Sequence, residues 1–273
     1  MTMRTSNPAL RRTSRASGRA VDESNRATYK GVAVKTIYFA FVALFAAVGI
    51  VAALFLACAP LFDETAVITE AEASRFLWIL GFALIGSVAL TLIGVIGCAV
   101  SRKAVPVFGT IYALGEGLMI GVVSAFAELL VQGVVLAALV STFVVFAVMS
   151  VLFFTGVIKV GRKFRSVLMT VLFSVVVISI LFTLLALFVP AVQALLYNPA
   201  FAGISVLVSV GMVILASLFI LFDLSLIKEA VDAGLDKSYE WYGAFGLTVT
   251  LLWLYMEFLR LFLKLAALFG RRR

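Results

Sequence analysis

Three acidic residues lie inside long apolar stretches of the sequence, at Glu116, Asp223 and Glu257. A charge at the centre of a membrane costs about 2.5–3.5 kcal/mol on insertion scales, so such residues usually face the interior of a helix bundle. The sequence has no histidine, which removes the commonest general base and metal ligand. Proton transfer would therefore depend on carboxylates, and carboxylates also bind hard cations such as calcium.

Asp223 and Glu257 are 34 residues apart, on two consecutive apolar stretches. If the hairpin between them turns near Glu240, the two carboxyl groups lie at equal depth and can meet. Two such groups in a low-dielectric bundle share a proton, which predicts a pH-sensitive pair and a candidate calcium contact. The alternatives are a helix-end acid near the headgroups for Asp223, and an ion pair with Arg260 at i+3 for Glu257.

Glu116 lies about eleven residues into its own apolar stretch, among Gly115, Gly117 and Gly121. A midplane acid flanked by glycines predicts a residue that lines a cation path. The alternative is a neutral carboxyl group that is hydrogen-bonded across helices. The spacing of Gly117 and Gly121 also predicts that a second helix backbone approaches closely at this point.

The composition identifies the class of protein that must position these acids. Of 273 residues, 64% are apolar and 13% are charged, and the mean hydropathy is +1.18. Soluble domains are about half apolar and about one quarter charged, so the sequence predicts an all-α polytopic membrane protein. It contains no nucleotide-binding, nucleophile-elbow or zinc-protease motif. We expect no enzymatic activity, no cofactor and no nucleic-acid partner.

Seven stretches reach the roughly 20 apolar residues that a spanning helix needs. The residues before them predict a disordered, basic cytoplasmic tail over 1–35, and the spans make up a transmembrane domain over 36–268, followed by a basic tail over 269–273. The predicted spans are 36–58, 76–100, 105–127, 131–154, 166–190, 201–224 and 243–268.

The connections alternate in charge, which predicts the orientation of the chain. Loop 59–75 carries four acids, whereas loops 101–104 and 155–165 are basic. Basic loops stay in the cytoplasm, so the N-terminus is predicted to be cytoplasmic. Seven crossings then place the C-terminus outside, although its three final arginines would favour the inside. Cys58 and Cys98 fall at opposite membrane faces, about 30 Å apart, and are predicted to be unpaired.

Residues 222–228 (FDLSLIK) and 246–262 (GLTVTLLWLYMEFLRLF) resemble the last two helices of the Bax inhibitor-1 (TMBIM) family. Residues 141–149 are similar to its fourth helix. Residues 112–121 and 6–10 resemble its bacterial YccA/YetJ-like branch. The resemblance covers about 36–268.

This resemblance implies a seven-helix bundle in which three helix pairs surround a central C-terminal helix. It implies a pH-sensitive calcium leak in a bacterial plasma membrane, with Asp223 and Glu257 as the sensor. It also implies a basic latch on the sixth-helix acid, which would be Arg102, with Lys103 as the alternative. Some members carry an acid in the second helix that this sequence lacks; Glu116 either substitutes for it or is a feature of the subgroup.

Three functions follow as hypotheses. The first is a calcium leak gated by the carboxyl pair, whose partners are the bilayer, calcium ions and protons. The second is a non-conducting regulator that binds another membrane protein, such as a protease or a cell-death factor. The third is a proton-coupled transporter. Calcium flux and substrate-dependent proton movement in proteoliposomes distinguish them.

Overall fold

The computed structural model describes residues 25–58, 70–190, 192 and 202–270. Within these residues the chain forms seven long helices and one short 3₁₀ helix, η3 (Arg102–Ala104). The long helices are α2 (Tyr29–Cys58), α3 (Glu70–Val100), α4 (Val105–Leu130), α5 (Val134–Phe154), α6 (Arg162–Phe188), α8 (Ala202–Asp232) and α9 (Ser238–Gly270). The prediction of an all-α polytopic membrane protein is confirmed.

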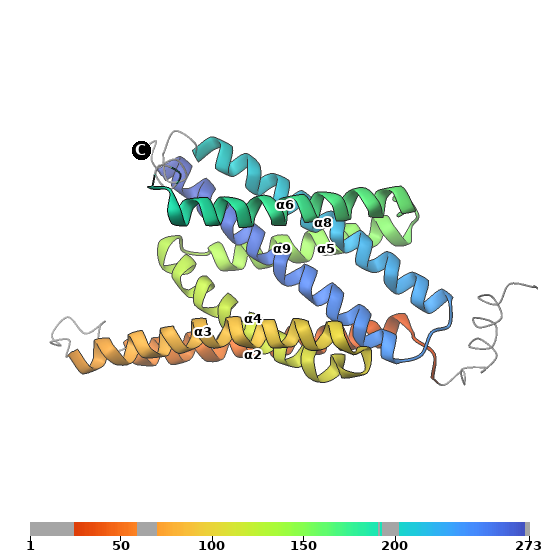
Figure 1. Ribbon diagram of the computed structural model, residues 1–273, viewed down its shortest axis with the longest axis horizontal. Coiled ribbons are helices and arrows are strands. Elements are labelled where there is room, and N and C mark those ends of the chain that lie inside the picture. The colour runs from red at the N-terminus through yellow and green to blue at the C-terminus, as the bar shows by residue number, and fades with distance from the viewer. Residues whose placement is uncertain (1–24, 59–69, 191, 193–201, 271–273) are drawn as a thin grey trace, which may run out of the picture.

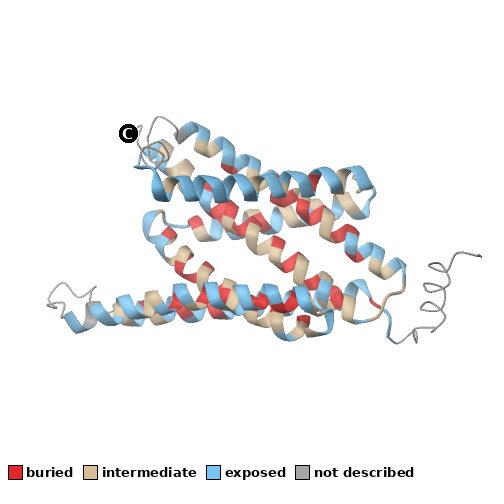
Figure 2. Ribbon diagram, viewed as in Figure 1, coloured by how far each residue is buried: buried red, intermediate tan, exposed pale blue. Residues whose placement is uncertain are grey.

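Six of these helices are long and apolar enough to cross a membrane by length and composition. The seventh, α9, is 33 residues long but carries the four charged residues Glu240, Glu257, Arg260 and Lys264. It tolerates them because it is central: it packs against α2, α4, α5 and α8. Figure 1 shows α9 crossing diagonally between two groups of helices, and Figure 2 shows buried residues along much of its length.

The other helices form two groups of three instead of the three pairs that the resemblance implied. In one group, α4 packs against both α2 and α3; in the other, α8 packs against both α5 and α6 (Figure 1). The central position of the C-terminal helix is confirmed, and the grouping around it is corrected.

Glycines on α4 allow the close helix packing that their spacing predicted. A Cβ atom at Gly117 would lie 2.3 Å from the Ala43 carbonyl oxygen, and one at Gly121 would lie 2.6 Å from the Ala47 carbonyl oxygen. Both oxygens belong to the backbone of α2, which therefore rests directly on the glycine face of α4. Backbone atoms cannot move aside as a flexible side chain would.

Replacing Gly117 with alanine should therefore destabilise the protein by about 1–3 kcal/mol, the usual cost of overpacking. Gly86→Ala on α3 is the matched control, because nothing lies within 4 Å of a Cβ atom at Gly86 and alanine is the better helix former. Thermal unfolding in detergent, followed by circular dichroism, measures both. Equal melting temperatures for the two variants would contradict this role of Gly117.

Helix α6 is the least embedded helix of the bundle. Its packing partner is α8, its buried residue is Leu168, and it is largely exposed in Figure 2. At its start, the Arg165 guanidinium donates two hydrogen bonds to the Glu229 carboxylate on α8, at 2.9 and 2.6 Å. This arrangement leaves most of the apolar surface of α6 facing the bilayer or the space beside α8.

The segments predicted to be cytoplasmic lie together at one end of the bundle, at the right in Figure 1. The chain before α2 pairs with the α8–α9 connection, where the Ala27 amide donates to the Leu235 carbonyl at 2.7 Å. The Tyr29 ring contacts the Phe154 ring at the end of α5, with centroids 5.8 Å apart. These contacts hold the chain before α2, the end of α5 and the α8–α9 connection at the same end of the bundle.

The predicted disordered tail over 1–35 is too long at its C-terminal end. The chain is already paired at Asn25, whose carbonyl accepts a hydrogen bond from the Lys237 amide at 3.1 Å, and α2 begins at Tyr29. The basic residue Lys35 lies within this helix and forms an ion pair with an acidic residue of α9. Residues 1–24 and 271–273 lie outside the described residues.

The predicted spans fall on the seven helices, most of which extend further at their ends. Helix α3 begins at Glu70, so the predicted acidic loop 59–75 supplies the first helical turn. The structure does not describe Asp63, Glu64 or the connection over 193–201, nor the side chains of Cys58 and Glu72. Cys98 is a free, buried cysteine.

Candidate functional site

A cavity of about 1180 Å³ lies among α3, α6, α8 and α9, with η3 at one end. Most of its lining is apolar. The charged residues on its wall are Arg102, Asp223, Glu229, Glu257 and Arg260. Two of the three acids singled out from the sequence therefore share one cavity, together with the proposed latch residue.

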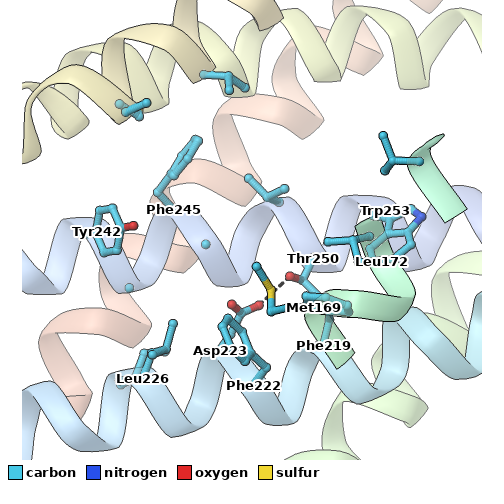
Figure 3. Close-up of a pocket in the computed structure, with 18 of the residues that line it drawn as sticks. Met169, Leu172, Phe219, Phe222, Asp223, Leu226, Tyr242, Phe245, Thr250 and Trp253 are labelled. Carbon is cyan, nitrogen blue, oxygen red and sulfur yellow. Dashed lines mark hydrogen bonds between the residues drawn. The ribbon is translucent and has the colours of Figure 1, made fainter. Parts of the chain in front are cut away.

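Asp223 projects from α8 toward the central helix (Figure 3). Its Oδ2 atom accepts a hydrogen bond from the Thr250 hydroxyl of α9. The side chain is half-buried, and Figure 3 shows it beside Phe222 and near Met169. The contact with Thr250 joins α8 to α9 through a polar bond within an otherwise apolar region.

Glu257 lies two turns further along α9 and is only 3% exposed. Its Oε1 atom accepts hydrogen bonds from the Trp253 indole at 3.0 Å and from the Arg260 guanidinium at 3.1 Å. Both donors are on the same helix, one turn before and just under one turn after. The ion pair with Arg260, one of the alternatives drawn from the sequence, is present.

The predicted direct pairing of Asp223 with Glu257 does not occur in this structure. Thr250, the partner of Asp223, precedes Glu257 by seven residues, a rise of about 10 Å along a helix. The prediction placed the hairpin turn near Glu240, but α8 ends at Asp232 and α9 begins at Ser238. The turn is therefore centred about five residues before Glu240. Because the two helices of a hairpin are mirrored about the turn, this difference changes the residue opposite Asp223 by about ten positions.

Arg102 is the residue of the predicted latch that reaches this cavity, but its contacts are with α9. Its guanidinium donates a hydrogen bond to the Tyr239 hydroxyl. It also lies over the Tyr239 and Tyr242 rings, 5.0 and 6.0 Å from their centroids. Because these aromatic faces attract the cation, Arg102 connects η3 to the start of the central helix instead of to Asp223. Lys103 is exposed.

Glu116 lies on α4, outside the lining of this cavity. It is half-buried, and its hydrogen-bond partner is Tyr112, one turn earlier. The neighbouring glycines pack against helices: Gly117 and Gly121 against α2, and Gly115 against Thr91 of α3. The space left by these glycines is filled by neighbouring helices, and a role for Glu116 in a cation path stays a prediction.

Nothing in the described part of the chain brings three carboxylate or cysteine side chains together as a metal cluster. The candidate calcium contacts, Asp223 and Glu257, are separate acids on one cavity wall. They could attract a cation in transit, each with one carboxylate, but they do not form a shared coordination sphere.

The sequence identified most of the charged residues of this site but few of their partners. The signal that could have identified these partners is the recurrence of polar atoms along an apolar helix, at Tyr239, Tyr242 and Thr250. Glu240 was placed near the predicted hairpin turn, yet this residue is only 3% exposed and accepts a hydrogen bond from Lys35. That ion pair joins the start of α2 to the start of α9.

Comparison with known proteins gives a family match over nearly the whole chain. A family model described as "Bax inhibitor 1 like" matches residues 7–267, which include every helix except the last three residues of α9. None of the curated proteins compared with the chain matches it.

Proposed function

The chain belongs to the Bax inhibitor 1-like family, and on that premise we propose that it is a pH-sensitive leak for cations, with calcium as the permeant ion. The observation that supports this proposal is the cavity that holds Asp223 and Glu257 among membrane-spanning helices. Intramembrane acids on a cavity wall are the usual mark of an ion or proton path. The proposed role is conduction, with no catalytic step and no resident cofactor.

The proposed pH response comes from the charge of the cavity wall. The lining contains three acids and two bases, so the wall carries a net negative charge when all five are ionised. Protonation of one carboxyl group removes that excess and the attraction for a cation. Asp223 is the proposed sensor because its hydrogen-bond partner is the Thr250 hydroxyl group, whereas Glu257 already has the Arg260 cation.

Purified protein in proteoliposomes tests the proposal. A calcium-sensitive dye inside the vesicles should report an influx that requires the protein and changes between about pH 6 and pH 8, the range in which a perturbed carboxyl group titrates. Vesicles without protein are the control. Absence of flux at every pH would contradict conduction and favour a regulator that binds another membrane protein.

We further propose a plasma-membrane location with a cytoplasmic N-terminus, which cysteine labelling tests. In a C58A/C98A background, Ala71→Cys and Gly270→Cys should react with an impermeant maleimide from outside intact cells. Lys159→Cys, at the opposite end of the bundle, should react only after permeabilisation. The reverse pattern would contradict the orientation. Labelling of Gly270→Cys together with Lys159→Cys would contradict seven crossings.

A further inference from the structure

One wall of the cavity is formed by α3 and α6, two helices that belong to different groups of the bundle. Helix α3 packs against α2 and α4, whereas α6 packs against α8, yet residues of both line the same space. Val95 of α3 is 44% exposed, and Val176 and Ile180 of α6 are 45% and 55% exposed. In a bilayer, exposed apolar side chains on spanning helices face lipid chains. The cavity is therefore open to the hydrocarbon region between α3 and α6.

One end of this apolar space carries an exposed cation. The bond to Tyr239 uses one of the five N–H donors of the Arg102 guanidinium. The ion pairs found among the described residues join other partners: Lys35 with Glu240, Arg165 with Glu229, and Arg260 with Glu257. Arg102 thus keeps its charge and several donors at the end of the bundle where the predicted cytoplasmic loops meet. Guanidinium groups bind phosphate oxygens in bidentate geometry.

We propose that this cavity binds an anionic phospholipid from the bilayer, with its phosphate on Arg102 and an acyl chain along the wall between α3 and α6. A cation at one end of a long apolar space fits a ligand with an anionic head and an apolar tail. Of the three acids on the cavity wall, Glu229 is paired with Arg165 and Glu257 with Arg260. The volume of about 1180 Å³ exceeds the roughly 300–1,000 Å³ of common small-molecule sites. A free phosphate ion would leave most of that volume unfilled. The proposal holds whether or not ions cross the cavity.

Trp253 provides a direct reporter, because its ring lines the cavity (Figure 3). A W78F/W241F variant leaves Trp253 as the single tryptophan. It is reconstituted in phosphatidylcholine nanodiscs that contain about one tenth of a lipid with brominated acyl chains, which quench tryptophan at contact. Brominated phosphatidylglycerol should quench Trp253 several-fold more than the same fraction of brominated phosphatidylcholine. Equal quenching by the two lipids, or no quenching by either, would overturn the proposal.

Two pairs of matched variants in the W78F/W241F background locate the site. Arg102→Gln should abolish the preference for the anionic lipid, whereas Lys103→Gln, which removes the neighbouring charge outside the cavity lining, should retain it. Val176→Phe should reduce quenching by filling the α6 wall. Val177→Phe should not, because Val177 is equally exposed but does not line the cavity. Equal effects within either pair would overturn the assignment.

Added inorganic phosphate distinguishes a lipid site from a simple phosphate site. The preference for brominated phosphatidylglycerol should persist at millimolar phosphate, because the acyl chain contributes to binding. If phosphate removes the preference, Arg102 binds the head group alone and the proposed lipid site is wrong.

Discussion

Replacing Asp223 with asparagine should remove the pH dependence of calcium flux and fix the flux at the level that the parent protein shows at its acid limit. Asparagine has nearly the same shape as a protonated aspartic acid, and it can still accept a hydrogen bond from Thr250. The change therefore isolates the charge. A one-unit shift in a pKa corresponds to about 1.4 kcal/mol, or about tenfold in an equilibrium, so a single sensor can produce a pH response of about that size.

Glu257→Gln should have a different effect, because Glu257 is bonded to the Arg260 guanidinium at 3.1 Å. Its removal leaves the Arg260 cation without its carboxylate partner on the cavity wall. We expect a lower cation flux at every pH, with the pH dependence retained. The two variants therefore distinguish a sensor at Asp223 from the shared carboxyl pair suggested by the sequence, since a shared pair would lose its pH dependence in both.

Glu116→Gln is the matched control, because it is the same kind of substitution at an intramembrane acid outside the cavity lining. Its flux and pH profile should equal those of the parent protein. The measurement is initial calcium flux in proteoliposomes at half-unit steps from about pH 6 to pH 8. A normal pH profile for Asp223→Asn would exclude Asp223 as the sensor, and a large loss in Glu116→Gln would move the ion path to α4.

The helices were predictable because each is an apolar run of spanning length, and such runs are visible without knowledge of their neighbours. A close backbone contact on α4 was also predictable, since Gly117 and Gly121 leave space that another backbone fills, and the structure identifies that backbone as α2. Both features depend on short-range spacing within one segment. The intramembrane acids were predictable for the same reason, because an acid within an apolar run can be identified from that segment alone.

Contacts between segments were less predictable, because they depend on register. The depth of Asp223 relative to Glu257 depends on where the hairpin between α8 and α9 turns. An error of about five residues in the position of that turn led the sequence analysis to pair two carboxyl groups that are separate in the structure. The partners of Arg102 were missed for a related reason. Its acidic partner was implied by the family resemblance, whereas the structure gives it the hydroxyl group and the ring of Tyr239.

The ion pair between Lys35 and Glu240 was missed because Lys35 was assigned to the disordered tail and Glu240 to the region of the hairpin turn. Burial of these two side chains follows from the fold of the cytoplasmic end. Gly31 also belongs to this site, because a Cβ atom there would lie 2.1 Å from the Glu240 Oε1 atom. A side chain at this position of α2 would therefore force the Glu240 carboxylate to shift.

Replacing Glu240 with alanine should destabilise the protein by about 3–5 kcal/mol, the usual cost of removing one partner of a buried ion pair. The Lys35 and Glu240 side chains are 16% and 4% exposed. The same carboxylate accepts hydrogen bonds from the Thr28 amide at 2.9 Å and the Thr28 hydroxyl at 3.0 Å. Thr28 in turn caps α2, since its hydroxyl accepts a bond from the Gly31 amide.

Two further variants separate the ion pair from general damage at this end of the bundle. Glu229→Ala removes an acid whose side chain is 63% exposed in its pair with Arg165, and should cost less than about 1 kcal/mol. The double variant K35M/E240M should recover much of the stability lost in Glu240→Ala, because it leaves no buried charge unpaired. Thermal unfolding in detergent measures all of them. Equal losses in Glu229→Ala and Glu240→Ala would show that burial does not strengthen the Lys35 pair.

The same site predicts an acid-sensitive stability. Glu240 precedes the apolar stretch 243–268; burial alone would raise the pKa of its carboxyl group, but the hydrogen bonds from Lys35 and Thr28 outweigh burial and hold the pKa below its usual 4.5. Because the folded-state pKa lies below the unfolded value, the ionised carboxylate contributes stability that is complete above about pH 4.5 and is lost as the pH falls through the folded-state pKa. The parent protein should therefore lose melting temperature on acidification below that value. Glu240→Gln should start lower and lose less over the same interval. Parallel pH profiles for the two proteins would mean that Glu240 does not contribute to stability through its charge.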